Sequence, residues 1–133
     1  MARRLGVKAC LLGHVGDDDF GEEVLRGPRD VGVDVSPVVK VAGQATALSM
    51  IVLRGDGDKT ILLAANANDA WGEGDIEAAV KIVETAPAGS VLTVDLEVPV
   101  AVVRAAVRAA QARGSRSCSI HRRPSACPTT STR

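Results

Sequence analysis

Short apolar runs alternate along the chain with segments whose apolar residues recur at the spacing of an α-helix. The run Lys8–Gly13 ends in glycine and predicts a strand buried on both faces. Residues 17–25 predict a helix, because the leading aspartates can cap it and place negative charge at its positive end. We expect this helix to stop near Arg26, since Gly27 and Pro28 are both unfavourable inside a helix, proline by about 3 kcal/mol.

Residues 38–65 show a different pattern, in which β-rich stretches follow one another closely. These stretches are Val38–Val41, Thr46–Leu53 and Thr60–Ala64. The sequence Gly-Asp-Gly-Asp at 55–58 separates the last two and predicts a hairpin turn. We therefore expect an antiparallel ribbon over about 38–65.

The second half of the chain returns to alternating helix and strand. Asp75 can cap a helix whose apolar face consists of Ile76, Ala79, Val80 and Val83. Ser90–Asp95 predicts another buried strand, and Val98–Arg113 predicts a helix rich in alanine, valine and arginine. Alternating strands and helices with an inserted ribbon predict an α/β domain that carries a β-flap.

Composition narrows the class of protein. With 133 residues, 46% of them hydrophobic, the chain is long enough for one compact domain and too short for two. Sixteen basic and sixteen acidic residues cancel, so charge favours neither nucleic acid nor a membrane as a partner. The absence of a signal peptide and of a long apolar run predicts a cytoplasmic protein. The three cysteines, an odd number without metal-binding spacing, are expected to be free thiols.

Four short motifs follow one another in a fixed order. They are Leu5-Gly6 with Gly16–Gly21 (GDDDFG), then Gly32–Val35 (GVDV), Asn66–Asn68 (NAN) and Leu96–Pro99 (LEVP). In this order and at these gaps they resemble the ribokinase/PfkB family of carbohydrate kinases, whose pattern contains LG, VGDDxFG, GVDV, GAN and LExP. The resemblance covers residues 2–113 and implies a partial ribokinase-like three-layer fold, with a parallel sheet flanked by helices and the ribbon as its lid.

Two positions depart from the family pattern. Ala47 stands where the lid has the glycine of a Thr-Gly pair, and Asn66 stands where the GAN motif has its glycine. Asparagine can adopt the left-handed conformation that a glycine often provides, so we expect Asn66 to do so.

The resemblance also implies an activity, in which ATP donates its γ-phosphoryl group to ribose or a similar sugar with the help of Mg²⁺. Glu97 matches the glutamate that hydrogen-bonds sugar hydroxyls in ribokinases, and a carboxylate at the end of a strand suits polar recognition. The alternative for Glu97 is a solvent-facing acid before Pro99. The family's GGKGAN sugar-binding segment and its GAGD catalytic turn do not occur in the sequence. We therefore expect that the ATP and Mg²⁺ sites are not present in this chain and that it is inactive alone.

The composition changes again at Gly114, where serine, arginine, proline and threonine begin to dominate. Without an apolar period, residues 114–133 are predicted to be disordered. One permitted set of codons, read from the third base of each codon, gives Leu-Pro-Val-Val-Leu-Asn-Pro-Ser-Pro-Ala. This resembles the strand and NPxPA motif that follow the last helix in the family. We therefore expect a chain truncated at both ends, with an out-of-frame tail over 114–133.

Other polar residues allow two interpretations each. Asp17–Asp19 could bind a metal, but capping and surface exposure explain them more simply, because hard cations need several convergent oxygens. Asn66 and Asn68 either hold a turn or lie near a ligand. His14 could be a general base, although no partner acid or nucleophile is visible in the sequence, and Trp71 either fills the edge of the core or stacks on a ligand.

Three functions remain open from the sequence. The first is a fragment of an ATP-dependent sugar kinase, inactive alone, with a small ribose-like sugar as its partner. The second is a non-catalytic binding or dimerisation module that pairs through the lid ribbon, as family lids do in dimers, and the third is a non-functional gene product. An upstream GGKGAN sequence in the DNA would favour the first.

Overall fold

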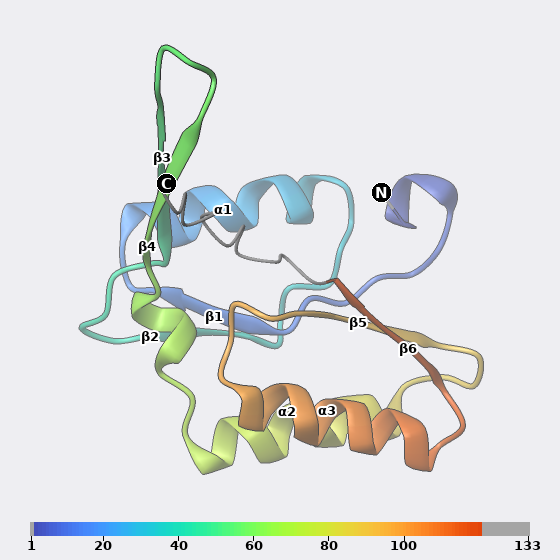
Figure 1. Cartoon of the computed structure of the whole chain (residues 1–133). Helices are drawn as coiled ribbons and strands as arrows, with labels where there is room; N and C mark the ends of the chain where they lie inside the picture. Colours follow the sequence, from blue (N-terminus) through green and yellow to red (C-terminus); the bar gives the residue numbers. More distant parts are fainter. Residues whose placement is uncertain (1, 121–133) are drawn as a thin grey trace, which may run out of the picture.

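The structure is a computed structural model, and it describes residues 2–120 of the chain. Two parallel strand pairs form the middle layer, with α1 on one side and α2 and α3 on the other (Figure 1). An antiparallel ribbon, β3–β4, rises from one end of the molecule (Figure 1). This arrangement confirms the predicted α/β fold with helices on both sides of parallel strands and an inserted β-ribbon.

The longer helices alternate with the strands, as the sequence predicts. In chain order the elements are η1 (Ala2–Leu5), β1 (Gly13–Gly16), α1 (Asp19–Asp30), β2 (Val38–Val41), β3 (Leu48–Leu53), β4 (Lys59–Ala64), η2 (Asn66–Asp69), α2 (Glu73–Thr85), β5 (Val91–Asp95), α3 (Val100–Ala112) and β6 (Arg116–Ile120).

The parallel strands form two separate pairs, each with its own crossover helix. β1 pairs with β2, with Gly13 opposite Val38, and α1 connects them. β5 pairs with β6, and α3 connects them. Within residues 2–120, each of these four strands therefore has one paired edge and one free edge.

A small apolar core lies between the strands and the helices α2 and α3. Its buried centre consists of Val83, Ala106, Ala109 and Ala110, and Leu12, Val80 and Leu92 pack against it. Alanine supplies most of these contacts, so α2 and α3 can approach each other closely. In the described part of the chain no large side chain is fully buried.

The end of α1 corrects the sequence prediction, because the helix continues past Gly27 and includes Pro28. Proline costs most in mid-helix, whereas Pro28 stands only two residues before the last residue of α1. The helix instead ends at Asp30, and Gly32, which has a φ of 76°, closes it two residues later. There the N–H of Val33 donates to the Pro28 carbonyl and that of Gly32 to the Arg29 carbonyl, which is a Schellman closure.

Two predicted strand boundaries are also wrong. In the predicted strand Lys8–Gly13 only Gly13 belongs to β1, and a single bridge joins Cys10 to Asp34. Residues 9–11 exchange backbone hydrogen bonds with Asp34 alone, so the pairing there stays a single bridge and does not extend into a strand. Val38–Val41 was predicted as part of the ribbon, but it pairs with β1, because the ribbon proper extends only over 48–64.

The boundary predicted at Gly114 needs correction as well. Gly114, with a φ of 69°, closes α3, and the N–H of Ser115 donates to the Ala110 carbonyl. The chain then reverses, and Arg116–Ile120 forms β6 beside β5. Backbone pairing with an existing strand does not require an apolar period, so composition alone gave the wrong expectation for these five residues. Residues 121–133 of the predicted disordered tail lie outside the described residues.

Candidate functional site

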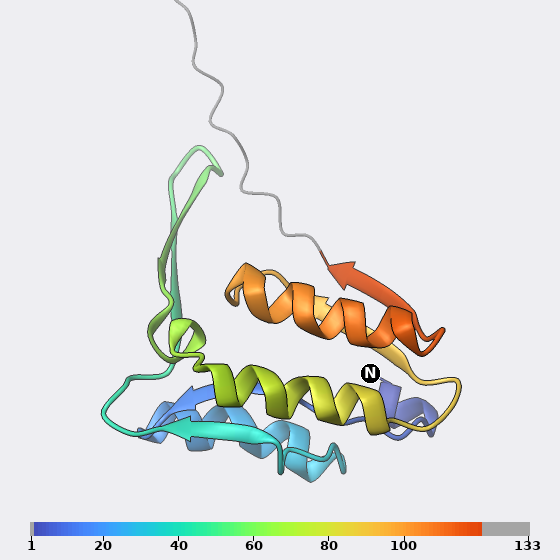
Figure 2. The ribbon, with the colours of Figure 1, turned by 90° about the horizontal axis from the view of Figure 1, so that it is seen from below.

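The strands β1, β2 and β5 all run toward the side of the molecule from which the ribbon rises (Figures 1 and 2). Ligands of open α/β sheets bind at the carboxyl ends of such strands. Asp17 follows β1 at this edge, and Glu97 follows β5 two residues after its end. The structure therefore places the predicted Glu97 on the ribbon side, at the carboxyl end of a parallel strand.

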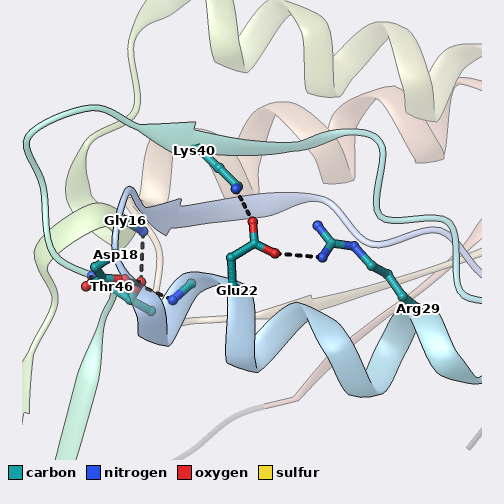
Figure 3. Close-up of polar contacts among 7 residues, drawn as sticks. Gly16, Asp18, Glu22, Arg29, Lys40 and Thr46 are labelled. Carbon is teal, nitrogen blue, oxygen red and sulfur yellow. Dashed lines mark hydrogen bonds and ion pairs between the residues drawn. The ribbon is translucent and has the colours of Figure 1, made fainter.

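Asp18 and Thr46 connect the first helix to the base of the ribbon (Figure 3). Asp18 is the N-cap of α1, and its carboxylate accepts a 2.9 Å hydrogen bond from the Gly21 N–H. The same carboxylate accepts two hydrogen bonds from Thr46, one from the backbone N–H at 2.8 Å and one from the hydroxyl. The Thr46 hydroxyl oxygen in turn accepts a 3.0 Å hydrogen bond from the Gly16 N–H.

Gly16 allows the backbone before the ribbon to approach β1 closely. A methyl group at this position would lie 2.4 Å from the Ala45 carbonyl carbon and 2.4 Å from the Thr46 nitrogen. Both atoms belong to the backbone, so neither can move aside without shifting the ribbon. The glycine of the GDDDFG motif is thus required by packing.

Asn66 closes the same joint from the other end of the ribbon. Its φ of 45° is left-handed, as the sequence predicts. Its side-chain amide donates a 3.0 Å hydrogen bond to the Thr46 carbonyl, and the neighbouring Ala67, fully buried, donates from its N–H to the Ala45 carbonyl. We call Gly16, Asp18, Gly21, Thr46 and Asn66 the ribbon joint.

Hydrogen bonds at the ribbon joint favour the ionised form of Asp18. The Thr46 hydroxyl, followed by the N–H groups of Thr46 and Gly21, lowers the pKa of the Asp18 carboxyl below its ordinary value. Nearby on α1, hydrogen bonds from Lys40 and Arg29 lower the pKa of Glu22 to about 2. Glu22 connects α1 to β2 through its ion pair with Lys40 (Figure 3).

Glu97 lies half-buried in the turn between β5 and α3. Its backbone N–H donates a 3.2 Å hydrogen bond to the side chain of Asp95, the last residue of β5. Pro99 is the N-cap of α3, so the turn is held between a strand end and a rigid helix start. The polar interactions of this turn fix the backbone that carries the Glu97 carboxylate.

His14, in β1, and Trp71, in the loop before α2, form a stacked pair. Their ring centroids are 4.0 Å apart and their planes differ by 9°. His14 is only 6% exposed, and the carboxylate oxygen of Asp75 that lies nearest to it is 4.0 Å from its Nε2. The stack supports the interpretation of Trp71 as a residue at the edge of the core.

The predicted cap of α2 needs correction. Asp75 is the third residue of α2, and it accepts a hydrogen bond from the N–H of Gly72, which is the N-cap.

Among residues 2–120, no three His, Cys, Asp or Glu side chains come together as metal ligands. Of the aspartates Asp17–Asp19, Asp18 already accepts hydrogen bonds from the N–H groups of Gly21 and Thr46 in the ribbon joint. Residues 2–120 also contain no helix that is long and apolar enough to span a membrane.

Sequence reasoning did not foresee the ribbon joint. Thr46 and Asp18 were each noted, as a lid residue and as a helix cap, but their contact joins positions 28 apart. The usable signal was the shared family pattern, in which both residues belong to motifs.

Comparison with known proteins gives a consistent result. The family model described as pfkB family carbohydrate kinase matches residues 1–130. The ribokinase of Schizosaccharomyces pombe is 34% identical over 107 residues, which make up 80% of this chain and 33% of that enzyme. Fructokinase-1 of Oryza sativa subsp. japonica is 43% identical over 63 residues, 47% of this chain and 20% of that enzyme.

A solved structure with similar fold is the ribokinase from Cryptococcus neoformans var. grubii serotype A in complex with ADP. It is 27% identical, has a TM-score of 0.67 and matches 89% of this chain and 35% of its own. The chain thus spans about a third of the length of the ribokinases it matches.

Proposed function

We propose that this chain, which belongs to the pfkB family of carbohydrate kinases, is the lid-bearing and sugar-contacting part of a kinase that phosphorylates ribose or a similar sugar. We propose ATP as the phosphoryl donor and Mg²⁺ as the metal that accompanies it. The proposed compartment is the cytoplasm, where ATP is available to such kinases. The observation that carries the proposal is the position of Glu97 and of the ribbon in the chain. Glu97 follows the parallel strand β5, and the ribbon follows the parallel strand β2. Both strands run toward the ribbon side (Figure 1), and α/β proteins bind small ligands at the carboxyl ends of such strands.

Glu97 has the chemistry that this role needs. An ionised carboxylate only accepts hydrogen bonds and offers two oxygens, so it suits neighbouring hydroxyl groups of a sugar. Charged acceptors form stronger hydrogen bonds than neutral ones, by roughly a factor of two. The half-buried position of Glu97 reduces competition from water.

The ribbon joint supplies a fixed base for a lid. A lid excludes water from a phosphoryl-transfer site and must return to the same place at each closure. The hydrogen bonds of Asp18 and Asn66 to Thr46 hold both ends of the ribbon to the body of the molecule.

The chain alone is proposed to be inactive. It spans about a third of the ribokinases it matches, and within residues 2–120 no three His, Cys, Asp or Glu side chains come together as metal ligands. Removing an oxyanion or phosphate donor set costs on the order of 10² to 10³ in rate, and a general base a similar factor. Catalysis is therefore proposed for the complete kinase.

Ribose is the proposed acceptor in preference to fructose. The match to the fission-yeast ribokinase covers 107 residues and that to the rice fructokinase 63. The match to the ribokinase covers 80% of this chain and that to the fructokinase 47%, so we take the longer match as the guide to the substrate class.

A chimaera tests this proposal. The matching 107-residue segment of the fission-yeast ribokinase is replaced by the residues of this chain. We expect ATP-dependent phosphorylation of ribose, with a higher kcat/KM for ribose than for fructose. In the chimaera, Glu97→Ala is expected to lower kcat/KM for ribose by about 10- to 100-fold, as loss of a charged hydrogen bond implies.

Glu77→Gln on α2 serves as the control, because Glu77 is exposed and far in sequence from the strand ends. A smaller exchange of residues 91–112 carries the same Glu97 if the larger one does not fold. Equal activity of the Glu97→Ala and Glu77→Gln chimaeras would assign Glu97 to the solvent-facing alternative.

A second role, dimerisation through the ribbon, is also supported by a specific observation. Both faces of β3–β4 are apolar and exposed, with Met50 57%, Ile51 55% and Leu62 56% exposed. Since neighbouring residues of a strand point to opposite faces, Met50 and Ile51 lie on different faces. A sugar site can cover one face of the ribbon at most, so we propose that a second copy covers the other.

A further inference from the structure

A hollow of about 230 Å³ lies between the β1–β2 pair and α2, which we call the α2 hollow. Its walls come mostly from apolar residues, and its polar members are His14, Ser36, Trp71 and Asp75. Figure 2 shows α2 running beside β2 and β1, so the hollow lies in the layer between strands and helix. It is formed by the face of the strands, whereas Glu97 follows the end of β5.

Three buried nitrogen atoms at this hollow have no hydrogen-bond partner in the protein. They are Nδ1 and Nε2 of His14 and Nε1 of Trp71. The His14 side chain is 1% exposed. A buried polar atom without a partner costs about 1 to 3 kcal/mol, and the cost of three at one place is large compared with domain stability.

The chemistry of these atoms defines what would satisfy them. The indole Nε1 of Trp71 only donates, and a neutral imidazole donates from one nitrogen and accepts at the other. A matching guest must therefore both accept and donate hydrogen bonds. A hydroxyl oxygen does both, whereas a carbonyl oxygen or an ammonium group does one.

Asp75 adds an acceptor at the same place. Its Oδ2 is 4.0 Å from Nε2 of His14, which is too far for a direct hydrogen bond and suits one oxygen between the two atoms. Among the residues that line the hollow, all in the described part of the chain, Asp75 alone is charged. An anion would face this carboxylate, and a bound metal would have too few ligands, so a neutral guest fits best.

We propose that the α2 hollow is a binding site for hydroxyl groups, supplied by ordered water or by a small neutral polyol. The guest accepts from Nε1 of Trp71 and donates to His14 or to Asp75. A volume of about 230 Å³ has room for several water molecules, each needing roughly 30 Å³, or for one four-carbon polyol. This site is separate from the proposed sugar edge and does not depend on it.

Trp71 makes the site directly observable, because it is the only tryptophan in the chain. The full chain labelled with ¹⁵N gives one indole N–H resonance, which is titrated with erythritol. If a polyol is the guest, this resonance shifts and saturates with concentration. Ala78→Leu narrows the hollow and is expected to abolish the shift, while Ala101→Leu, the same change on an exposed position of α3, leaves it intact.

A crystal structure of the full chain grown without polyol separates water from polyol. If erythritol gives no saturable shift, we expect ordered water oxygens within hydrogen-bond distance of Nε1 of Trp71 and of a His14 nitrogen. The proposal is overturned if neither nitrogen has an oxygen of a guest beside it, whether the hollow is dry or both residues bond to protein atoms. A saturable shift that survives Ala78→Leu would also overturn it, because erythritol would then act elsewhere.

Discussion

Asp18 accepts two hydrogen bonds from Thr46, although the two residues are 28 positions apart in the chain. One carboxylate thereby caps α1 and holds the base of the ribbon. Local capping and long-range docking usually depend on different residues, so a change at Asp18 affects both at once. The position of the proposed lid is consequently tied to the start of the helix that follows β1.

Replacing Asp18 by alanine is expected to destabilise the fold more than loss of a helix cap alone. A cap is worth about 0.5 to 2 kcal/mol, and each further hydrogen bond about 1 kcal/mol. Thr46→Val removes the hydroxyl but keeps the N–H, so it should cost less than Asp18→Ala. Urea unfolding of both single variants and the double variant gives the free energies of unfolding.

The double-mutant cycle provides the decisive comparison. We expect a coupling free energy of about 0.5 kcal/mol or more, because the two side chains contact each other directly. Additive effects would show that the contact between them contributes nothing to stability.

Gly16→Ala is expected to be severely destabilising. Its methyl group would meet the backbone of Ala45 and Thr46 at 2.4 Å, and neither can move without breaking the ribbon joint. Gly13→Ala, at the other end of β1, is the matched control, because nothing lies within 4 Å of the added methyl group there. We expect a loss of more than about 2 kcal/mol for Gly16→Ala and less than about 1 kcal/mol for Gly13→Ala. Similar melting temperatures for the two variants would contradict the close approach.

The sequence predicted element types well where local pattern decides them. The ribbon strands, the helix α3 and the left-handed Asn66 are all as expected. Each depends on neighbours in the chain, on alternation, helical spacing or the conformational freedom of one residue. The order of family motifs then led to the fold class, which local pattern alone would have left at a general α/β domain.

Predictions that depend on distant partners were less successful. Residues 8–12 have a strand-like composition, but composition does not say whether another strand lies on each side. The pairing of Arg116–Ile120 with β5 is the opposite case, in which a polar segment becomes a strand through its neighbour. The stack of His14 on Trp71 joins two elements that the sequence treats as unrelated.

Acid should weaken the connection between α1 and β2 through Glu22. Hydrogen bonds from Lys40 and Arg29 lower the pKa of Glu22 to about 2 from an ordinary value of 4.5. Since the folded pKa is the lower one, the stabilisation is fully present above about pH 4.5 and is lost as the pH falls toward 2. The stability of Glu22→Gln should therefore depend less on pH in this window than that of the original chain.

Added salt offers an independent check on the contribution of Glu22 to stability. The ion pair with Lys40 is exposed to solvent, so screening by salt should reduce the difference in stability between the original chain and Glu22→Gln. If the original chain and Glu22→Gln lose stability in parallel between pH 4.5 and 2, other carboxyl groups must account for the acid sensitivity.

The purified chain is expected to show no ATP-dependent phosphorylation of ribose above background. Among residues 2–120 no three His, Cys, Asp or Glu side chains come together as metal ligands, and the sequence lacks the family's GAGD turn. Loss of a general base and of anion-stabilising groups costs a large factor in rate. A coupled assay for ADP release, with preparations freed of host kinase, measures this directly. Turnover near the usual 1 to 100 per second of kinases would place the catalytic groups within this chain.

The last prediction concerns the exposed ribbon and the free strand edges. At its base the ribbon adjoins α1, because Leu48 lines a groove together with Phe20 and Val24. Met50 shares the Leu48 face, whereas Ile51 and its partner Ile61 lie on the opposite face, which points away from that groove. This second face has no cover within the described chain, and each apolar side chain buried on association contributes about 1.5 to 3 kcal/mol.

We therefore expect the chain to self-associate at micromolar concentration, and Ile51→Lys to weaken the association at least tenfold. Met50→Lys is the matched control, since it adds the same charge to the face beside α1 and should have the smaller effect. Sedimentation velocity over a concentration series measures both. The free edges of β1 and β5 add unpaired backbone groups, which are templates for further strand pairing. If neither substitution changes the self-association, these strand edges must mediate it instead. A monomer with a sharp cooperative melt would contradict both routes, because neither the apolar faces nor the open edges would then need a partner.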